Sequence, residues 1–367
     1  MNIRDKLGES NYTENLSKSI ITHGNNYRLK QALNQKNIKL AFLGGSVTQG
    51  YTPEKMIAQC YPILVKDKLK QLTKNKTNCH WLNLGFPGTD SSMGLILTEN
   101  YLVDYQPDVV FIEYAINHDI SIESATKFES LVRKLLHLRS KPAVIVITLL
   151  TKELYSAQDL MLHIAKHYEL PVISILDTLA PLLAENKINW NDYSMDEGHA
   201  NTSGHELIAD CIHSYFTHTL QSTRDNIYSI NNQILYAATY DGLELIDFGD
   251  VIACESTFDK ESLSSIFFPS VLRNNKSSEF HFFRTKQKCH GLLIVFLQSN
   301  QKEFGSANVF INDIKVCTLL GYSIFGWHNP VIKILPISNS LCDHKIEIVM
   351  DKEDEKKEFY LLSIAIF

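Results

Sequence analysis

The sequence predicts an α/β domain built on a parallel sheet, followed by a second domain of β-strands. Up to about residue 220, short apolar runs alternate with longer amphipathic runs, which is typical of a parallel sheet covered by helices. Beyond residue 223, short apolar runs separated by polar or glycine-containing connections favour a β-sandwich or jelly roll. With 367 residues, the chain is longer than one hydrophobic core comfortably supports. We therefore divide it into an N-terminal extension (1–36), an α/β domain (37–222) and a β-sandwich domain (223–367).

The first domain contains candidate strands that are apolar nearly throughout, as expected where helices cover both faces of a sheet. These strands span residues 39–43, 81–84, 109–114, 143–149 and 172–176. Helices are expected near residues 63–72, 122–139, 157–168 and 204–218. The last helix has the clearest pattern, since its apolar residues recur on one face and Ser203 with Glu206 matches a capping box at its start.

The second domain contains shorter candidate strands, at residues 243–248, 265–268, 279–283, 292–297, 308–311, 345–350 and 358–366. Polar and apolar residues alternate along 345–350, as in a strand with one buried face. The charged run 351–358 is predicted to be a solvated hairpin loop.

Composition excludes several functional classes. The net charge of -6 and the pI near 6.2 provide no basic surface for a phosphate backbone, so nucleic acid is not an expected partner. No apolar run approaches the roughly 20 residues that span a bilayer. Residues 1–16 lack the apolar core of a secretory signal, and we expect a cytoplasmic protein. Seven scattered cysteines without a CxxC pair predict free buried thiols rather than disulfides or a zinc site. Whether the chain forms a homo-oligomer is left open.

Ser46 lies in a glycine-rich loop directly after the first predicted strand. The carboxyl ends of parallel strands open onto the ligand crevice, so a hydroxyl at this point is presented to a substrate. The loop lacks the glycine spacing of a dinucleotide-binding turn. Gly45 and Gly50 have the spacing of a Walker loop, but Tyr51 stands where a lysine must hold the phosphates. The remaining alternatives are a nucleophile and a plain turn from strand to loop.

Asp196 and His199 lie three residues apart in the loop that leads into the last predicted helix. At this spacing a carboxylate can hold the ring N–H, fix the tautomer and stabilise an imidazolium. A surface aspartate and histidine would give the same pattern. Other histidines are interpreted as structural: His163 and His167 form a surface pair, and His205 lacks the second histidine of a zinc motif because Ala209 occupies that position.

Two further positions supply candidate donors for an oxyanion. Gly88 follows the second strand and offers a backbone N–H, while Asn117 follows the third strand and offers a side-chain amide. Either could be only a turn residue. However, the four segments that carry Ser46, Gly88, Asn117 and the Asp196–His199 pair all converge on one edge of the same predicted sheet, which favours a single site.

These four segments, in this order, resemble the four blocks of the SGNH, or GDSL-like, hydrolase superfamily over residues 37–220. The resemblance implies a flavodoxin-like three-layer α/β/α fold without metal or cofactor. It also implies that Ser46 is the nucleophile and that His199 is the base, oriented by Asp196. The implied oxyanion hole consists of the Ser46 N–H, Gly88 and Asn117.

The chain departs from the common family pattern at three positions. Gly45 replaces the usual aspartate, a variant also found in carbohydrate-active members of the superfamily. His118 replaces the aspartate that usually follows the asparagine of the third block, and Ala200 replaces the proline that usually follows the histidine. The last two departures bear on the support and the rigidity of the loops rather than on the implied catalytic groups.

The substrate expectation also comes from resemblance. A Gly-Gly-Ser block followed by a β-sandwich resembles bacterial esterases that remove acetyl groups from sugars, which implies a small-molecule or oligosaccharide acyl ester, most simply an O-acetyl ester. Two alternatives stay open: an O-acyltransferase that modifies a polysaccharide with the same triad, and a catalytically silent binding protein. In the second domain, Tyr322 and Trp327 are expected either to pack in the sandwich core or to stack on a sugar.

Overall fold

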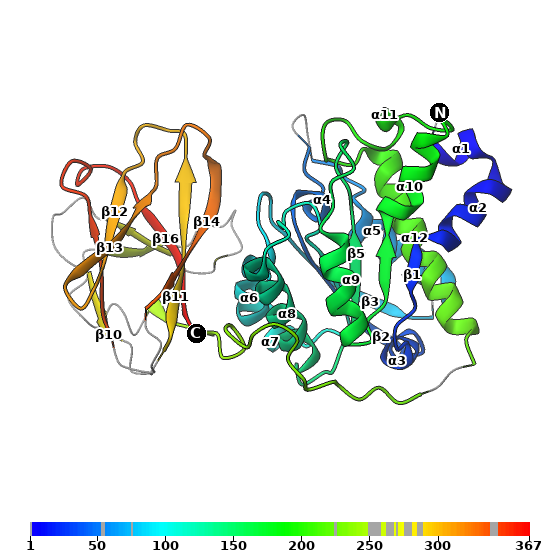
Figure 1. The fold of residues 1–367 in the computed structure, drawn as a ribbon, viewed down its shortest axis with the longest axis horizontal. Helices are drawn as coiled ribbons and strands as arrows, with labels where there is room; N and C mark the ends of the chain where they lie inside the picture. The colour runs from blue at the N-terminus through cyan, green and yellow to red at the C-terminus, as the bar shows by residue number, and fades with distance from the viewer. Residues whose placement is uncertain are drawn as a thin grey trace. The chain divides into compact units, whose positions relative to one another are not determined.

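The computed structural model describes residues 2–52, 56–74, 76–223, 226–248, 258–261, 268, 271–274, 281–284, 289–337 and 344–367 (Figure 1). The chain forms two compact units, Met1–Ala238 and Thr239–Phe367, and each is described by itself. The first unit therefore ends at residue 238 rather than at the expected boundary of 222. The reason is that the connecting segment is bonded to the first unit: the Leu235 and Tyr236 amides donate to the buried Glu129 carboxylate at 2.6 and 2.8 Å.

A six-stranded sheet in the order β1-β6-β5-β4-β2-β3 forms the centre of the first unit. Its strands are β1 (Ile20–Thr22), β2 (Asn37–Gly44), β3 (Asn78–Gly85), β4 (Val109–Glu113), β5 (Ala143–Thr148) and β6 (Val172–Ser174). Strands β2 to β6 run parallel, and β1 is antiparallel to β6 at the edge. Without β1, the spatial order is second, first, third, fourth, fifth, which is the flavodoxin-like order. The predicted parallel sheet is confirmed.

Helices cover both faces of this sheet (Figure 1). One layer contains α3 (Tyr27–Leu33), α5 (Tyr61–Leu72), α10 (Ile175–Ala184) and α12 (Thr202–Gln221), which share one hydrophobic core with alternate residues of the strands. The other layer contains α6 (Ser91–Leu97), α8 (Ile122–Leu136) and α9 (Gln158–His167). Side chains of a strand point alternately to the two faces, so both layers bury apolar residues and the strands read as continuous apolar runs.

The N-terminal residues are part of the first unit and not a separate extension. Helix α1 (Ile3–Leu7) buries Ile3 and Leu7, and α2 (Glu9–Lys18) buries Tyr12 and Leu16, in the same core as α12. The Tyr12 hydroxyl, on α2, donates to Asp210 on α12 at 2.8 Å. These contacts explain why residues 1–36 add helices and one strand to the α/β unit.

The start of α12 differs from the prediction. The N-cap is Asn201, whose side chain accepts a hydrogen bond from the Gly204 amide at 3.0 Å. Asparagine caps a helix as well as serine does, and Asn201 has the extended backbone that a cap needs. The predicted capping box of Ser203 and Glu206 is therefore wrong. The Ser203 hydroxyl instead accepts from the Ile3 amide at 3.0 Å and helps to hold α1.

The second unit contains two antiparallel sheets, in the orders β10-β15-β12-β13 and β14-β11-β16-β9-β8, with β7 paired to β16. The strands are β7 (Glu244–Leu245), β8 (Phe258–Glu261), β9 (Val271–Asn274), β10 (His281–Arg284), β11 (Gly291–Ser299), β12 (Ser306–Ile311), β13 (Ile314–Leu320), β14 (Trp327–Pro336), β15 (Lys345–Met350) and β16 (Tyr360–Ile366). Apolar residues from both sheets form one core, as in a sandwich. Of the predicted strand 265–268, residues 265–267 lie outside the described residues.

Two expectations for this unit are corrected. Residues 351–358 connect β15 in one sheet to β16 in the other, so they are not a hairpin loop. Their acidic side chains bind β12 instead, with Asp354 accepting from the Ser306 amide at 2.8 Å. Trp327 is 69% exposed, so the core position considered for it is wrong, while Tyr322 is half-buried. Within the described part of the chain, no helix is both long and apolar enough to cross a membrane.

Candidate active site

Ser46 begins α4 (Ser46–Gln49) at the carboxyl edge of the sheet, directly after β2. The last residue of β2, Gly44, pairs with Gly85 on β3 and with Glu113 on β4. The loops that follow these three neighbouring strands therefore start side by side. They are the loops that carry Ser46, Gly88 and Asn117, as expected from the parallel order.

Ser46, His199 and Asp196 form a hydrogen-bonded series. The Nε2 atom of His199 lies 2.9 Å from the Ser46 hydroxyl, and its Nδ1 atom lies 2.7 Å from Oδ2 of Asp196. The other Asp196 oxygen accepts from the amides of Gly198 and His199 at 2.9 and 2.7 Å. Partial burial opposes ionisation of Asp196, but these amides and the imidazole together lower its pKa below the ordinary value. The carboxylate is thus held ionised beside the ring.

The loop that carries Asp196 and His199 is held by hydrogen bonds rather than by a proline. The Ser194 hydroxyl donates to the His199 carbonyl at 2.7 Å, and the Trp190 indole N–H donates to the Asp196 carbonyl at 2.5 Å. Ala200, at the position where the family usually has proline, is fully buried. These contacts supply the rigidity that the sequence left in doubt.

Asn117 lies against the glycine that precedes the serine. A Cβ atom on Gly45 would lie 2.6 Å from Oδ1 of Asn117, closer than any real contact allows. The Asn117 side chain therefore occupies the space that an aspartate at position 45 would need. Its Oδ1 atom is buried without a hydrogen-bond partner among the described residues, and its Nδ2 atom lies farther from Gly45.

Gly88 has a left-handed backbone with φ of 68°. No atom lies within 4 Å of a Cβ built at this position, so the conformation, and not a lack of space, favours glycine. The loop of Gly88, which ends at Ser91, is joined to the Asn117 loop by His118. Nε2 of His118 accepts a hydrogen bond from the Ser91 amide at 3.0 Å. Burial lowers the pKa of His118, which keeps the ring neutral and able to accept. His118 thus links the two loops that carry the candidate oxyanion donors.

Two neighbours of the site were not predicted from the sequence. The Tyr51 ring packs edge-on against the His199 ring, with centroids 5.4 Å apart, and its backbone amide donates to the Ser46 carbonyl at 2.9 Å. The Tyr155 hydroxyl donates to the His118 carbonyl. In the sequence, Tyr51 is noted only as the residue that breaks a Walker motif. Its aromatic side chain, five residues after Ser46, could have indicated a contact with the site.

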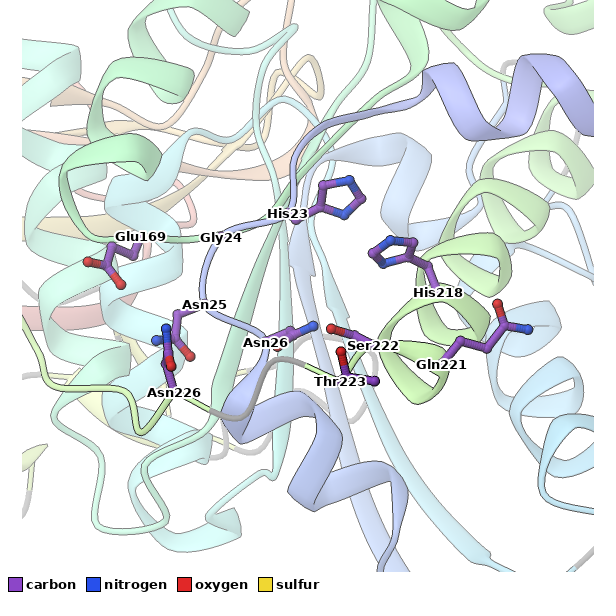
Figure 2. A pocket seen from close by; sticks show the side chains of 10 residues that line it. All are labelled: His23, Gly24, Asn25, Asn26, Glu169, His218, Gln221, Ser222, Thr223 and Asn226. Carbon is purple, nitrogen blue, oxygen red and sulfur yellow. The ribbon is translucent and has the colours of Figure 1, made fainter.

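A hollow at the opposite edge of the sheet has different chemistry. A pocket of about 590 Å³ is lined by polar residues next to the amino end of β6, including His23, Glu169 and His218. Figure 2 shows the His23 and His218 rings facing each other, and their centroids are 4.2 Å apart.

His163 and His167, the predicted surface pair, contact the segment that follows α12. Nε2 of His167 lies 2.7 Å from the Gln233 carbonyl, and the His163 ring packs near Tyr236.

Two solved structures that share this fold along both units are two-domain esterases. A two-domain esterase active on acetylated mannans, co-crystallised with mannopentaose, is 23% identical to this chain, with a TM-score of 0.81 over 95% of this chain and 97% of that one. Another crystal structure of a two-domain esterase active on acetylated mannans matches at 23% identity, with a TM-score of 0.79 and the same coverage. No family model matches the sequence, and no curated protein matches it. The chain therefore shares the fold of these two-domain esterases along nearly its whole length.

Proposed function

We propose that the protein is a serine esterase that hydrolyses short-chain acyl esters, with Ser46 as nucleophile and His199 as base. The observation that carries this proposal is the series of hydrogen bonds from Ser46 through His199 to Asp196, with separations of 2.9 and 2.7 Å. The series lies at the carboxyl edge of a parallel sheet, where such folds bind their ligands. The fold shared with two-domain esterases adds support.

The reaction follows from the positions of the protons. The Nδ1–H of His199 donates to Asp196, which leaves Nε2 to accept the Ser46 proton as Oγ attacks the carbonyl carbon. The oxyanion that forms is stabilised by the N–H groups of Ser46 and Gly88 and the Asn117 amide. The alcohol leaves with the proton from His199, and water then hydrolyses the acyl-enzyme to release the acid and restore the serine.

The substrate class that we propose is an O-acetylated carbohydrate. The shared fold covers both units of an esterase active on acetylated mannans. In the second unit, Phe325 and Trp327 expose large aromatic surfaces, at 77% and 69% exposure, of the kind that stacks on sugar rings.

The test is the release of acetate from p-nitrophenyl acetate and from acetylated mannan. Ser46→Ala and His199→Ala should each lower turnover of both esters at least about 10⁴-fold, because the triad acts as a unit. Ser17→Ala and His137→Ala, which alter exposed serine and histidine side chains elsewhere, are the matched controls and should retain native turnover. Equal rates for the native protein and Ser46→Ala would refute the proposal. Transfer of acetyl to an added sugar in preference to water would identify an acyltransferase instead.

A further inference from the structure

Glu113, the last residue of β4, is a carboxyl group buried beneath the candidate nucleophile. Its side chain is 0% exposed, and its backbone carbonyl accepts from the Gly45 amide at 3.3 Å. A carboxyl group is almost never fully buried unless it is paired, because removing its charge from water is costly. Neither the triad nor the candidate oxyanion hole uses this group, so its burial requires another explanation.

The Glu113 carboxyl is bonded to the helix that presents Ser46. The Thr48 hydroxyl, two residues after Ser46 on α4, donates to Oε2 of Glu113 at 2.9 Å. The same hydroxyl lies 2.8 Å from the Tyr61 hydroxyl on α5. Hydrogen bonds therefore run from α5 through α4 to the end of β4, the strand that leads into the Asn117 loop. This series holds Ser46 and Asn117 in a common framework.

The two carboxyl oxygens of Glu113 differ in their hydrogen bonding. Oε1 of Glu113 is buried without a hydrogen-bond partner in the part of the chain that the structure describes. An ionised carboxylate would carry half of its charge on this atom, which accepts no hydrogen bond from the described residues. A protonated carboxyl avoids this cost and still accepts the Thr48 hydrogen bond through Oε2.

The ionisable groups around Glu113 are also uncharged at neutral pH. They are the phenols of Tyr61 on α5, Tyr114 directly after β4 and Tyr193 on α11 (Trp190–Tyr193), and burial raises the pKa of each. Behind Tyr61, His205 on α12 accepts from the Tyr61 amide, and burial lowers the pKa of His205 to about 4. None of these groups supplies a positive charge. Burial therefore raises the pKa of Glu113 to about 8, although hydrogen bonds from Thr48 and backbone amides oppose the shift.

We propose that Glu113 is a positioning residue that works in its protonated form, holding the Ser46 helix through Thr48, and that its ionisation impairs the site. Ionisation would place a negative charge behind the loop that must stabilise an oxyanion, and would draw water or a displaced donor toward Oε1. Both effects act on the transition state more than on substrate binding, so they lower kcat rather than raise KM. The inference rests on the proposed role of Ser46, but its first test does not need catalysis.

The first test compares the thermal unfolding of the native protein and Glu113→Gln across pH. A carboxyl group with a raised folded-state pKa contributes most stability below its ordinary value of 4.5, and this contribution is lost as pH rises toward about 8. Glutamine cannot ionise. The Tm of Glu113→Gln should therefore rise relative to the Tm of the native protein as pH increases from 4.5 to about 8, and the difference in Tm should stay constant above pH 8. Titration of all other groups cancels in this difference. A Tm difference that does not change with pH would overturn the proposal.

The second test measures kcat and KM for p-nitrophenyl acetate across pH. The native kcat should fall above about pH 8, whereas Glu113→Gln should keep kcat within about threefold of native at pH 7 and lose this alkaline decline. An identical alkaline decline in both proteins contradicts the proposal. So does a folded Glu113→Gln that is inactive at every pH, because the ionised group would then be required.

A threonine pair keeps the proposal testable if Glu113→Gln does not fold. Thr48→Val should lower kcat about tenfold with little change in KM, since small displacements of a reacting group are costly, and Thr48→Ser should restore it. The matched control is Thr178→Val on α10, which removes another buried hydroxyl, bonded to the Ser174 carbonyl at 2.7 Å. If Thr48→Val and Thr178→Val have the same kcat, the hydroxyl at position 48 does not position Ser46.

Discussion

The two edges of the central sheet differ in how their polar groups are arranged. At the carboxyl edge, Ser46, His199 and Asp196 are joined at hydrogen-bond distances, and the surrounding loops are bonded to one another. At the amino edge, a pocket of about 590 Å³ is also lined by polar side chains, but His23 and His218 are stacked there rather than joined to a nucleophile. The two edges therefore differ in how their polar side chains are aligned, and not in whether polar side chains are present.

The difference has a topological cause. In a parallel sheet, each strand ends at the same edge, and the loops that follow neighbouring strands converge there. Gly44, Gly85 and Glu113 are in register, so the three loops that follow them start side by side. At the amino edge lie the ends of helices and the connecting segment, where side chains such as Tyr215 and Tyr228 donate to backbone carbonyls, those of His23 and Tyr168.

After the substitutions of Ser46 and His199, the largest effect is expected from Asp196→Asn. This change keeps the size of the side chain but removes the charge that stabilises the imidazolium and the acceptor that selects the tautomer of His199. We expect kcat to fall at least about 10³-fold, measured with p-nitrophenyl acetate under saturating conditions. A loss below tenfold would show that the carboxyl edge does not depend on this pair.

A smaller effect is expected from Asn117→Ala. Removal of one oxyanion donor should lower kcat by roughly 10²-fold with little change in KM, because the bond strengthens as charge develops. Gln31→Ala, at an exposed side-chain amide on α3, serves as the control for loss of an amide elsewhere in the unit. Undiminished turnover by Asn117→Ala would remove this residue from the mechanism.

The smallest effect is expected at the amino edge. His218→Ala removes one of the two stacked rings and should leave kcat/KM within about twofold of native, since it does not belong to the hydrogen-bonded series. The measurement is the same ester assay, with Tm recorded alongside to detect any loss of stability. A tenfold loss of kcat/KM at unchanged Tm would mean that the two edges are coupled, and would contradict the contrast drawn above.

Much of the first unit is predictable from the sequence because its signals are local. The apolar runs of β2 to β6 and the polar residues after them are visible without any knowledge of packing. Capping is less predictable, since Asn201 and Ser203 are both good caps and only the contact with Ile3 decides between them. Glu113 is hidden for another reason: it ends an apolar strand, and only the structure shows that it faces Thr48.

The second unit shows where local patterns fail. Strands β13 and β14 were not predicted, and both lie at sheet edges. Pro330 and Pro336 lie within β14, where an edge tolerates the missing N–H but a sequence pattern reads a break. Ile314 is 68% exposed at the start of β13, so this strand lacks the buried alternation that marks a sandwich core.

The connection between the two units affects how the protein can be dissected. Besides the amides of Leu235 and Tyr236, the Glu129 carboxylate accepts from the Tyr168 hydroxyl at 2.6 Å. A fragment cut at residue 222 would remove both backbone donors from this buried carboxyl group. An excised first unit therefore has to extend through Ala238, and a shorter fragment would be an unsuitable reference for measuring what the β-sandwich contributes.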